Sequence, residues 1–217
     1  MQKKKYEVLL LDAANTIIYK PDLIPSFLSV LKKNGFDADE IQLRKNHKLL
    51  SEVIHFPDVT SKEFYCMFNN EVMLSMGIVS SKQLLDDIFA NCSYLPWRPF
   101  QDTHVLKTLS IKKAILSNFN ASINIKINNI FGDHLFDSII GSEKEGIGKP
   151  NIEFYKRALD VLNVDPEKIL YVGDSIKLDV VPARSIGIET YLIDRDRNFL
   201  QFNKRIDSLA DLIEIIK

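Results

Sequence analysis

The sequence predicts an α/β protein with a parallel sheet core and an inserted α-helical cap domain. Short apolar segments, typical of strands buried on both faces, recur in the second half of the chain and alternate with helical patterns. Alternation of strand and helix is typical of a mostly parallel sheet. A long stretch with helical patterns alone separates the first apolar segment from the others, which indicates a second, helical unit.

The strand candidates are short runs dominated by apolar residues. They are Tyr6–Leu11, Lys112–Ser117, Asp137–Ser142, Lys168–Gly173 and Glu189–Asp194. In the segment NIEFYKRALDVLNV, Ile152, Tyr155 and Leu159 recur at helical spacing, which predicts a helix between the third and fourth strands. The closing segment IDSLADLIEIIK carries Leu209, Leu212, Ile213 and Ile216 on one face, so we expect a final helix against the sheet.

The stretch between the first two strands contains helix-start patterns, and prolines lie at both of its ends. Three capping-box patterns occur in it, namely Asp37 with Glu40, Thr60 with Glu63, and Ser80 with Gln83. Prolines near Lys20 and Trp97 interrupt regular structure and suggest hinges. We therefore expect a core domain of residues 1–18 and 96–217 and a helical cap domain of residues 19–95.

The composition of the chain does not favour binding to nucleic acid or to a membrane. The chain has 217 residues, 46% of them hydrophobic, and a net charge of -1, so no large basic field favours nucleic acid or an anionic membrane. No run of 18 or more apolar residues predicts a membrane span. Cys66 and Cys92 show neither metal spacing nor a disulfide framework, which fits a cytoplasmic protein. The sequence gives no indication of oligomeric state.

Polar residues follow the proposed strands at their carboxyl ends. Asp12 follows the first, Ser117 ends the second, Lys149 comes shortly after the third, and Asp174 with Ser175 follows the fourth. In an open parallel sheet the ligand site lies outside these ends, so we expect these residues to converge. Carboxylates completed by water and phosphate are the ligands that Mg²⁺ prefers, and a lysine and a serine can hold phosphoryl oxygens.

The order of these motifs resembles that of the haloacid dehalogenase superfamily of aspartate-nucleophile hydrolases. The first motif is similar to Asp12-Ala13-Ala14-Asn15-Thr16, the second to Ser117 in ILSN, the third to Lys149 in GKP, and the fourth to GDSIKLD with Asp174 and Asp179. The resemblance covers essentially the whole chain. It implies a Rossmann-like core, and the helical insertion after the first motif resembles the family's C1-type cap.

The resemblance implies a covalent mechanism on a small phosphorylated molecule. Asp12 would attack phosphorus to give an aspartyl-phosphate. Mg²⁺ would be held by the other oxygen of Asp12, by the backbone carbonyl of Ala14 and by Asp174.

Further residues would support this chemistry. Ser117 and Lys149 would hold the phosphoryl oxygens, and Asn118 would contact the substrate beside Lys149. Asp179, together with Ser175, would orient the metal waters or the lysine.

Ala14 departs from the pattern of the family's phosphatases. These enzymes carry a second aspartate there, which protonates the leaving oxygen and later activates water. Asn15 replaces a glycine, but asparagine tolerates the left-handed backbone angles that the turn requires.

Three readings follow from Ala14. In the first, the chain is a phosphatase whose acid or base comes from the cap, the substrate or water. In the second, it is a phosphonatase-like C–P hydrolase, since phosphonatases of the superfamily also carry alanine at this position and use a cap lysine, for which Lys45 and Lys48 are available. In the third, it is a non-catalytic protein that binds phosphate or a partner. The retained acidic motif favours an enzyme, and it disfavours a metal-independent dehalogenase. We expect a phosphatase.

Overall fold

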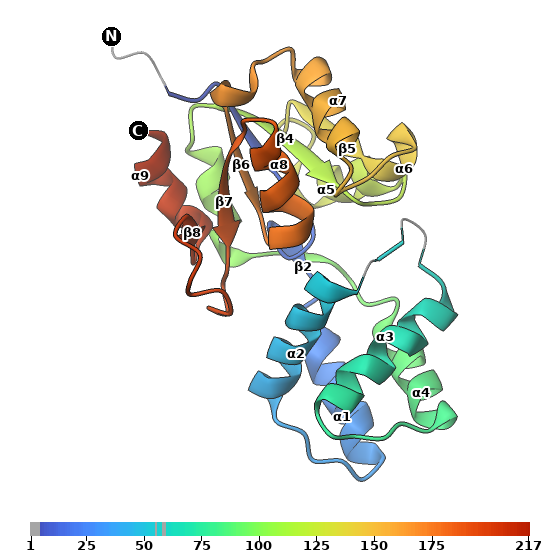
Figure 1. Ribbon diagram of the computed structural model, residues 1–217. Coiled ribbons are helices and arrows are strands. Elements are labelled where there is room, and N and C mark those ends of the chain that lie inside the picture. The colour runs from blue at the N-terminus through green and yellow to red at the C-terminus, as the bar shows by residue number, and fades with distance from the viewer. Residues whose placement is uncertain (1–4, 55, 58–59) are drawn as a thin grey trace. The chain divides into compact units, whose positions relative to one another are not determined.

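The computed structural model describes residues 5–54, 56–57 and 60–217. These residues form two compact units (Figure 1). Unit 1 contains the described residues up to Tyr19 together with Pro99–Lys217, and unit 2 contains Lys20–Arg98. The chain therefore leaves unit 1 once, after Tyr19, and returns to it once, at Pro99.

Unit 1 is built on a parallel sheet. Its strands are β1 (Val8–Leu11), β4 (Lys112–Ser117), β5 (Ser138–Gly141), β6 (Ile169–Gly173), β7 (Glu189–Ile193) and β8 (Arg205–Ile206). Their order across the sheet is β5-β4-β1-β6-β7-β8, and every pair of neighbours is parallel. The predicted α/β fold class with a parallel sheet core is thus confirmed. The two-residue β8 was not predicted.

The first strand lies at the centre of this sheet. Leu10 pairs with Ala114 of β4 on one side and with Tyr171 of β6 on the other. All four residues of β1 are buried, because helices cover both of its faces. The chain adds strands on one side of β1 and then on the other, so the strand order reverses there, and such a reversal marks the usual ligand site of an open α/β sheet.

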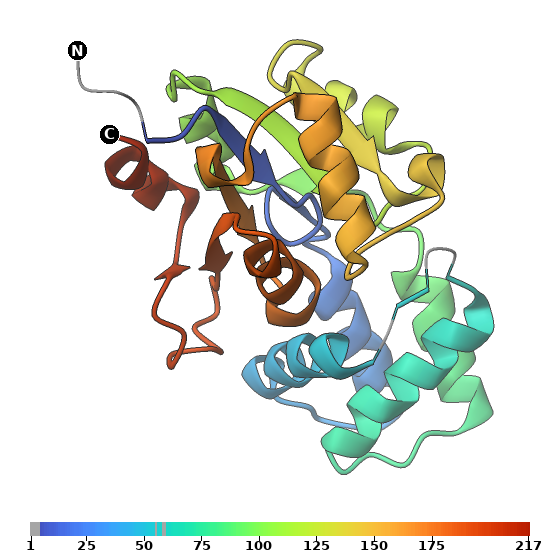
Figure 2. The same cartoon turned by 45° about the horizontal axis from the view of Figure 1, so that its top comes forward.

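Helices flank the sheet of unit 1. In chain order they are η1 (Gln101–Lys107), α5 (Ile123–Phe131), α6 (Ser142–Glu145), α7 (Ile152–Leu162), η2 (Pro166–Lys168), η3 (Ile176–Val180), α8 (Val181–Ser185), η4 (Leu209–Asp211) and α9 (Leu212–Ile216). Figure 2 shows α7 and α8 on one face, where Phe154 and Ala183 pack with Leu10 and Tyr171 in one apolar cluster. This packing is what holds the strand ends at fixed positions.

The closing segment forms in two parts. It begins as the 3₁₀ turn η4 and continues as α9, so its residues do not follow one helical period. Leu209 and Leu212 are buried as predicted, but Ile213 is 38% exposed. The prediction of a single apolar face was therefore wrong at Ile213.

Unit 2 is helical. It contains α1 (Leu23–Lys33), α2 (Glu40–Val53), α3 (Lys62–Ser75) and α4 (Lys82–Cys92), packed around Phe27, Leu43, Phe68, Val72 and Ile88. The strands β2 (Ile18–Tyr19) and β3 (Arg98–Pro99) form a separate two-stranded sheet. Among the described residues, no helix has both the length and the apolar character needed to cross a membrane.

The helix starts of unit 2 differ slightly from the predicted ones. The N-caps are Asp39, Ser61 and Ser81, each one or two residues after the predicted Asp37, Thr60 and Ser80. Each of these side chains accepts a hydrogen bond from a backbone N–H three residues ahead. Because two oxygen-bearing residues stand close together at each start, the sequence cannot indicate which of them takes the cap.

Candidate active site

Asp12 lies at the carboxyl end of the central strand. Its N–H continues the ladder of β1 by donating to Val172 at 2.9 Å, and the residue is 4% exposed. Asp12 Oδ1 accepts a hydrogen bond from Ser117 Oγ at 3.0 Å and lies 2.6 Å from Lys149 Nζ. The structure thus brings together the three residues for which the sequence analysis expects a catalytic role.

The loop after Asp12 turns tightly. The carbonyl of Ala13 accepts hydrogen bonds from the N–H groups of Thr16, Ile17 and Ile18. Asn15 has φ 59°, which confirms the expected left-handed backbone at this position. The turn carries the Thr16 hydroxyl to 3.3 Å from Asp12 Oδ2, a contact that the strand-end pattern did not predict.

Lys149 bridges two buried carboxylates. Its Nζ lies 2.7 Å from Asp179 Oδ1 in addition to its contact with Asp12. Asp179 is 1% exposed, and it also accepts hydrogen bonds from the Tyr171 hydroxyl at 2.7 Å and from the N–H of Ser175 at 2.9 Å. Asp179 is therefore fixed from three sides.

Tyr171 was missed by the sequence analysis. It lies in β6, it is fully buried, and Lys149 Nζ approaches its hydroxyl to 3.4 Å. A buried tyrosine hydroxyl needs a polar partner, so a tyrosine inside the apolar run before GDS was a usable signal.

Asp174 and Ser175 follow β6. Oxygens of Asp12, Asp174 and Asp179 lie within 4.8 Å of one another. Ser175 Oγ accepts a hydrogen bond from the N–H of Leu178 and so caps η3, the π-helical turn that carries Asp179 back to the strand ends. Ser175 contacts Asp179 through its backbone N–H.

Asn118 pairs with the backbone of Lys149. Its Nδ2 donates to the Lys149 carbonyl at 2.8 Å, and its Oδ1 accepts from the Lys149 N–H at 2.7 Å. This reciprocal pair fixes the loop that carries the lysine. The substrate contact expected for Asn118 stays a prediction, and the hydrogen bonds add a supporting role that the sequence did not indicate.

The titration of the cluster follows from its burial. Burial raises the pKa of the Asp12 carboxyl to about 6. The ammonium of Lys149 opposes this rise, while the carboxylates of Asp179 and Asp174 add to it. Burial alone would lower the pKa of Lys149, but its contacts with Asp12 and Asp179 hold that pKa above its ordinary value. Lys149 is therefore charged at neutral pH.

The donor set fits a divalent cation. The cluster contains three carboxylates and one ammonium, so it carries two negative charges in excess when all its acids are ionised. Hard oxygen ligands are what Mg²⁺ prefers, and a bound cation would offset the repulsion that raises the pKa of Asp12.

In the metal-free protein, we expect ionisation of Asp12 to weaken folding. Its pKa is about 6 when folded, against 3.8 for a free side chain, so the folded state binds this proton more tightly. The contribution of Asp12 to stability is therefore full below about pH 4 and is lost as pH rises through about 6. Urea unfolding in chelator should show the stability of wild type falling relative to Asp12→Asn over this interval, by on the order of 2 to 3 kcal/mol. A stability difference between wild type and Asp12→Asn that stays constant over this pH interval would contradict the raised pKa of Asp12.

Gly173 leaves room for Asp179. A Cβ atom at this position would lie 2.3 Å from the Asp179 carboxyl carbon, a distance that no packing tolerates. We expect Gly173→Ala to displace Asp179 from Lys149 and to destabilise unit 1 by about 2 to 4 kcal/mol, as overpacking and a broken buried ion pair combine. Gly141→Ala is the matched control, because its Cβ would meet the Ile123 side chain at 3.0 Å and the Phe119 carbonyl oxygen at 3.5 Å, and no buried carboxylate. Equal losses in thermal unfolding of the two variants would contradict this expectation.

Lys45 and Lys48, the two lysines of α2 considered for a Schiff-base role, lie in different environments. Lys48 Nζ makes an ion pair with Glu52 at 2.9 Å, one helical turn along α2. Lys45 lies on the exposed side of the same helix. An amine must be unprotonated to attack a carbonyl, so the ion pair of Lys48 does not favour a Schiff-base role.

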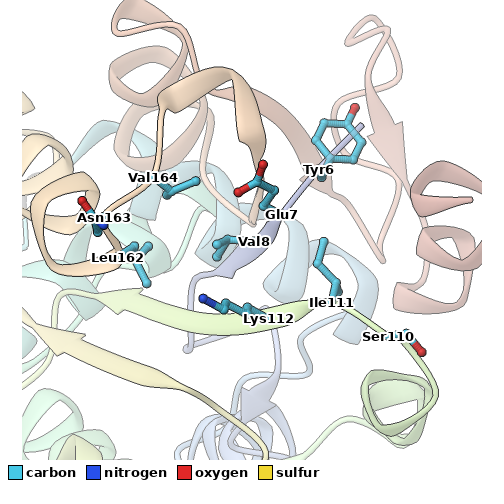
Figure 3. Close-up of a pocket in the computed structure, with 9 residues that line it drawn as sticks. All are labelled: Tyr6, Glu7, Val8, Ser110, Ile111, Lys112, Leu162, Asn163 and Val164. Carbon is cyan, nitrogen blue, oxygen red and sulfur yellow. The ribbon is translucent and has the colours of Figure 1, made fainter. Parts of the chain in front are cut away.

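A cavity lies at the opposite end of the strands, where β1 and β4 begin. It has a volume of about 340 Å³ and is formed at the beginning of β1, before β4 and at the end of α7 (Figure 3). Its lining combines apolar side chains with Glu7 and Lys112. Asp12 lies at the other end of β1, so this cavity does not belong to the acidic cluster.

Comparisons with known proteins agree with this architecture. A family model described as haloacid dehalogenase-like hydrolase matches residues 93–187. A glyceraldehyde 3-phosphate phosphatase of Methanocaldococcus jannaschii is 31% identical over 134 residues, which are 55% of this chain and 57% of that protein. The chain thus spans little more than half the length of this relative. A glyceraldehyde 3-phosphate phosphatase of Methanothermobacter thermautotrophicus is 25% identical over 198 residues, 78% of this chain and 81% of that protein.

The fold is also similar to solved structures. The HAD-hydrolase YfnB of Bacillus subtilis, solved bound to magnesium, has a TM-score of 0.69 and is 17% identical, covering 99% of this chain and 100% of that chain. At this identity the likeness shows the fold alone. The family model over residues 93–187, the curated relatives and the shared fold agree with the order of the motifs in the sequence.

Proposed function

We propose that this protein is a Mg²⁺-dependent phosphohydrolase that acts on a small phosphorylated molecule. The observation that carries the proposal is the convergence of a buried carboxylate, Asp12, with Ser117 Oγ at 3.0 Å and Lys149 Nζ at 2.6 Å, at the strand end where the sheet order reverses. The names of its curated relatives, glyceraldehyde 3-phosphate phosphatases, support phosphate-ester hydrolysis.

Asp12 is the nucleophile in this proposal. One of its carboxylate oxygens forms a bond to phosphorus while the bond from phosphorus to the leaving oxygen breaks, giving an aspartyl-phosphate. Water then attacks this phosphorus, which releases inorganic phosphate and restores the carboxylate. Ser117 and Lys149 already point at Asp12 and would donate to the phosphoryl oxygens as negative charge moves onto them.

The metal would be held by Asp12, by Asp174 and by the backbone carbonyl of Ala14. When bound, it supplies a positive charge that polarises the phosphoryl group. Asp179 would act through its neighbours, because its carboxylate already accepts hydrogen bonds from Lys149, Tyr171 and the Ser175 N–H. Asn118 would fix the lysine and line the substrate side of the phosphate site.

Ala14 gives this proposal its distinctive feature. An alanine can neither protonate the leaving oxygen nor activate water, so the proton of the leaving group must come from the cap, from the substrate or from water. We therefore infer that esters with acidic leaving groups, such as aryl or acyl phosphates, turn over faster than alkyl phosphates.

A substitution at this position tests the point. We expect Ala14→Asp to raise kcat for an alkyl phosphate by about 10² to 10⁴, the usual contribution of a general acid or base, and to change an aryl phosphate much less. Ala14→Asn is the control, because an asparagine side chain has nearly the same size as an aspartate side chain but carries no acid. If Ala14→Asp folds and binds metal without a gain in kcat, another group already supplies the proton.

Hydrolysis of a phosphonate C–P bond is the second candidate, since phosphonatases of the superfamily that this sequence resembles also carry alanine at the position of Ala14. It would need a cap lysine, Lys45 or Lys48, to form a Schiff base with an aldehyde-bearing phosphonate. Borohydride reduction in the presence of such a phosphonate would label that lysine. The absence of labelled peptide, in protein that hydrolyses phosphate esters, would remove this candidate.

The central experiment is phosphate release from a panel of small phosphate esters that includes glyceraldehyde 3-phosphate. Wild type should release phosphate with Mg²⁺ and lose this activity in chelator, and Asp174→Asn should require a higher Mg²⁺ concentration. Asp133→Asn, a change at an exposed acid of the same unit, should behave as wild type. No release from any ester by folded, Mg²⁺-loaded protein would favour a non-catalytic role that binds phosphate or a partner.

A further inference from the structure

A buried ion pair outside the acidic cluster ties together distant segments of unit 1. Arg195, just after β7, meets Asp102 of η1 in a two-pronged contact, with Nη1 to Oδ2 at 2.5 Å and Nη2 to Oδ1 at 3.0 Å. Their side chains are 20% and 15% exposed. A forked, largely buried contact of this kind fixes the orientation of the guanidinium as well as its position.

The same guanidinium reaches the loop that follows Asp12. Arg195 Nη2 also donates to the carbonyl of Thr16 at 2.9 Å, and the Thr16 hydroxyl lies 3.3 Å from Asp12 Oδ2. A continuous chain of polar contacts therefore runs from Asp102 through Arg195 and Thr16 to the carboxylate of Asp12.

The guanidinium also lies on an aromatic pair at the points where the chain leaves and re-enters unit 1. Its carbon is 3.9 Å from the centre of the Phe100 ring, and this ring stacks on Tyr19 at 4.1 Å with 11° between the planes. The N–H of Phe100 donates to the carbonyl of Ile17 at 3.1 Å. Arg195 thus contacts both the outgoing and the returning segment.

Asp102 is held by further donors. Ser208 Oγ and the N–H of Leu209 each donate to Asp102 Oδ2 at 2.8 Å. Although burial opposes ionisation, these donors and Arg195 keep the pKa of Asp102 below its ordinary value. Arg195 Nε, by contrast, is buried without a hydrogen-bond partner among the described residues. A buried N–H left without a partner is costly and indicates that the two Nη groups carry the function of this side chain.

We infer that Arg195, oriented by Asp102, is a positioning residue for Asp12. It fixes the Thr16 carbonyl, and through it the turn that aims the Thr16 hydroxyl at the nucleophile. This inference rests on the proposed function for its kinetic consequence, but its structural consequence is independent of activity. Neither residue belongs to the sequence motifs that predict the acidic cluster.

The test compares Arg195→Lys with Arg205→Lys. Lysine keeps the charge but cannot contact Asp102 and Thr16 with one planar fork. We expect Arg195→Lys to lower kcat about 10-fold or more with little change in KM, because a displaced nucleophile weakens the reaction more than ground-state binding. Arg205 is the matched control, since its side chain is similarly buried, at 16% exposed, and pairs with Asp207 and Asp194 instead of Asp102.

Asp102→Asn provides the second variant. It removes the charge that orients Arg195 and keeps the shape of the side chain, so it should lower kcat in the same way. The double variant Arg195→Lys/Asp102→Asn should be no slower than the slower single variant, because both changes break the same contact. Multiplying effects would show that the two residues act separately and would overturn the inference.

A third measurement, hydrogen exchange, does not depend on enzyme activity. Hydrogen exchange at the amides of Thr16, Ile17 and Ile18 should accelerate in Arg195→Lys by more than the loss of global stability explains, and should be unchanged in Arg205→Lys. Wild-type kcat with unchanged exchange in Arg195→Lys would overturn the inference. If wild type itself hydrolyses no ester but the exchange changes as expected, then the proposed function fails and the positioning role of Arg195 stands.

Discussion

Replacing Asp12 by asparagine removes phosphate release and leaves unit 1 folded; this is the largest effect that we expect. The amide keeps an oxygen for Ser117 and Lys149 and offers an N–H to the Thr16 hydroxyl, so the contacts of the site survive. It cannot form the aspartyl-phosphate. Loss of the covalent route should lower kcat by about 10⁴-fold or more.

Stability separates this effect from misfolding. Because burial and two neighbouring carboxylates raise the pKa of Asp12, ionising it is unfavourable, and Asp12→Asn should unfold at the same temperature as wild type or higher above pH 6 in chelator. The measurement is single-turnover phosphate release at saturating ester together with thermal unfolding, and Asp133→Asn is the control. If Asp12→Asn retains wild-type turnover, the nucleophile lies elsewhere or the activity comes from a contaminant.

Replacing Lys149 by methionine has the second largest expected effect, because it acts on both activity and stability. Methionine fills a similar volume but leaves Asp12 and Asp179 without the ammonium that lies 2.6 and 2.7 Å from them. Breaking a buried ion pair from one side costs about 3 to 5 kcal/mol. Since the pKa of Lys149 is held above its ordinary value, its contribution is present at neutral pH and is lost only in strong alkali.

The pH dependence of this variant identifies the cause. Without the ammonium, the pKa of Asp12 should rise above its wild-type value of about 6. Asp12 of Lys149→Met should therefore take up its proton at a higher pH than in wild type, and the variant should regain much of its lost stability as the pH falls toward 6. Urea unfolding at pH 5 and pH 8 measures this, with the exposed Lys144→Met as the control. A loss of equal size at both values would point to poor packing of methionine instead of an uncompensated charge.

The sheet could be predicted largely from local patterns. The strand Lys112–Ser117 has the predicted bounds, because its apolar run coincides with its hydrogen-bonded ladder. The first strand begins at Val8 and not at Tyr6, since Tyr6 is buried before the ladder starts. The strand Arg205–Ile206 has no apolar run of its own and forms by pairing with the edge of β7, so no local signal could reveal it.

The site could be predicted only where residues stand at strand ends. The positions of Asp12, directly after β1, and Ser117, the last residue of β4, follow from the rule that parallel strands present their carboxyl ends on one side of the sheet. Lys149 follows α6, so the strand-end rule alone does not place it. The contacts around them do not follow from any spacing. Asp102 and Arg195 are far apart in sequence and on irregular segments, and Asn118 acts through the backbone of Lys149, so these partners required the three-dimensional structure.

The central strand finds its two neighbours only late in synthesis. Val8 pairs with Lys112 and with Ile169, so β1 emerges from the ribosome long before either partner. The helices of Lys20–Arg98 are complete by then and contact one another within this stretch, and contacts between residues closer in sequence form faster. We therefore expect the nascent chain to fold unit 2 first and to keep β1 unpaired until β4 emerges. During that interval VLLL is an exposed apolar strand, and a chaperone that binds such segments would find it there.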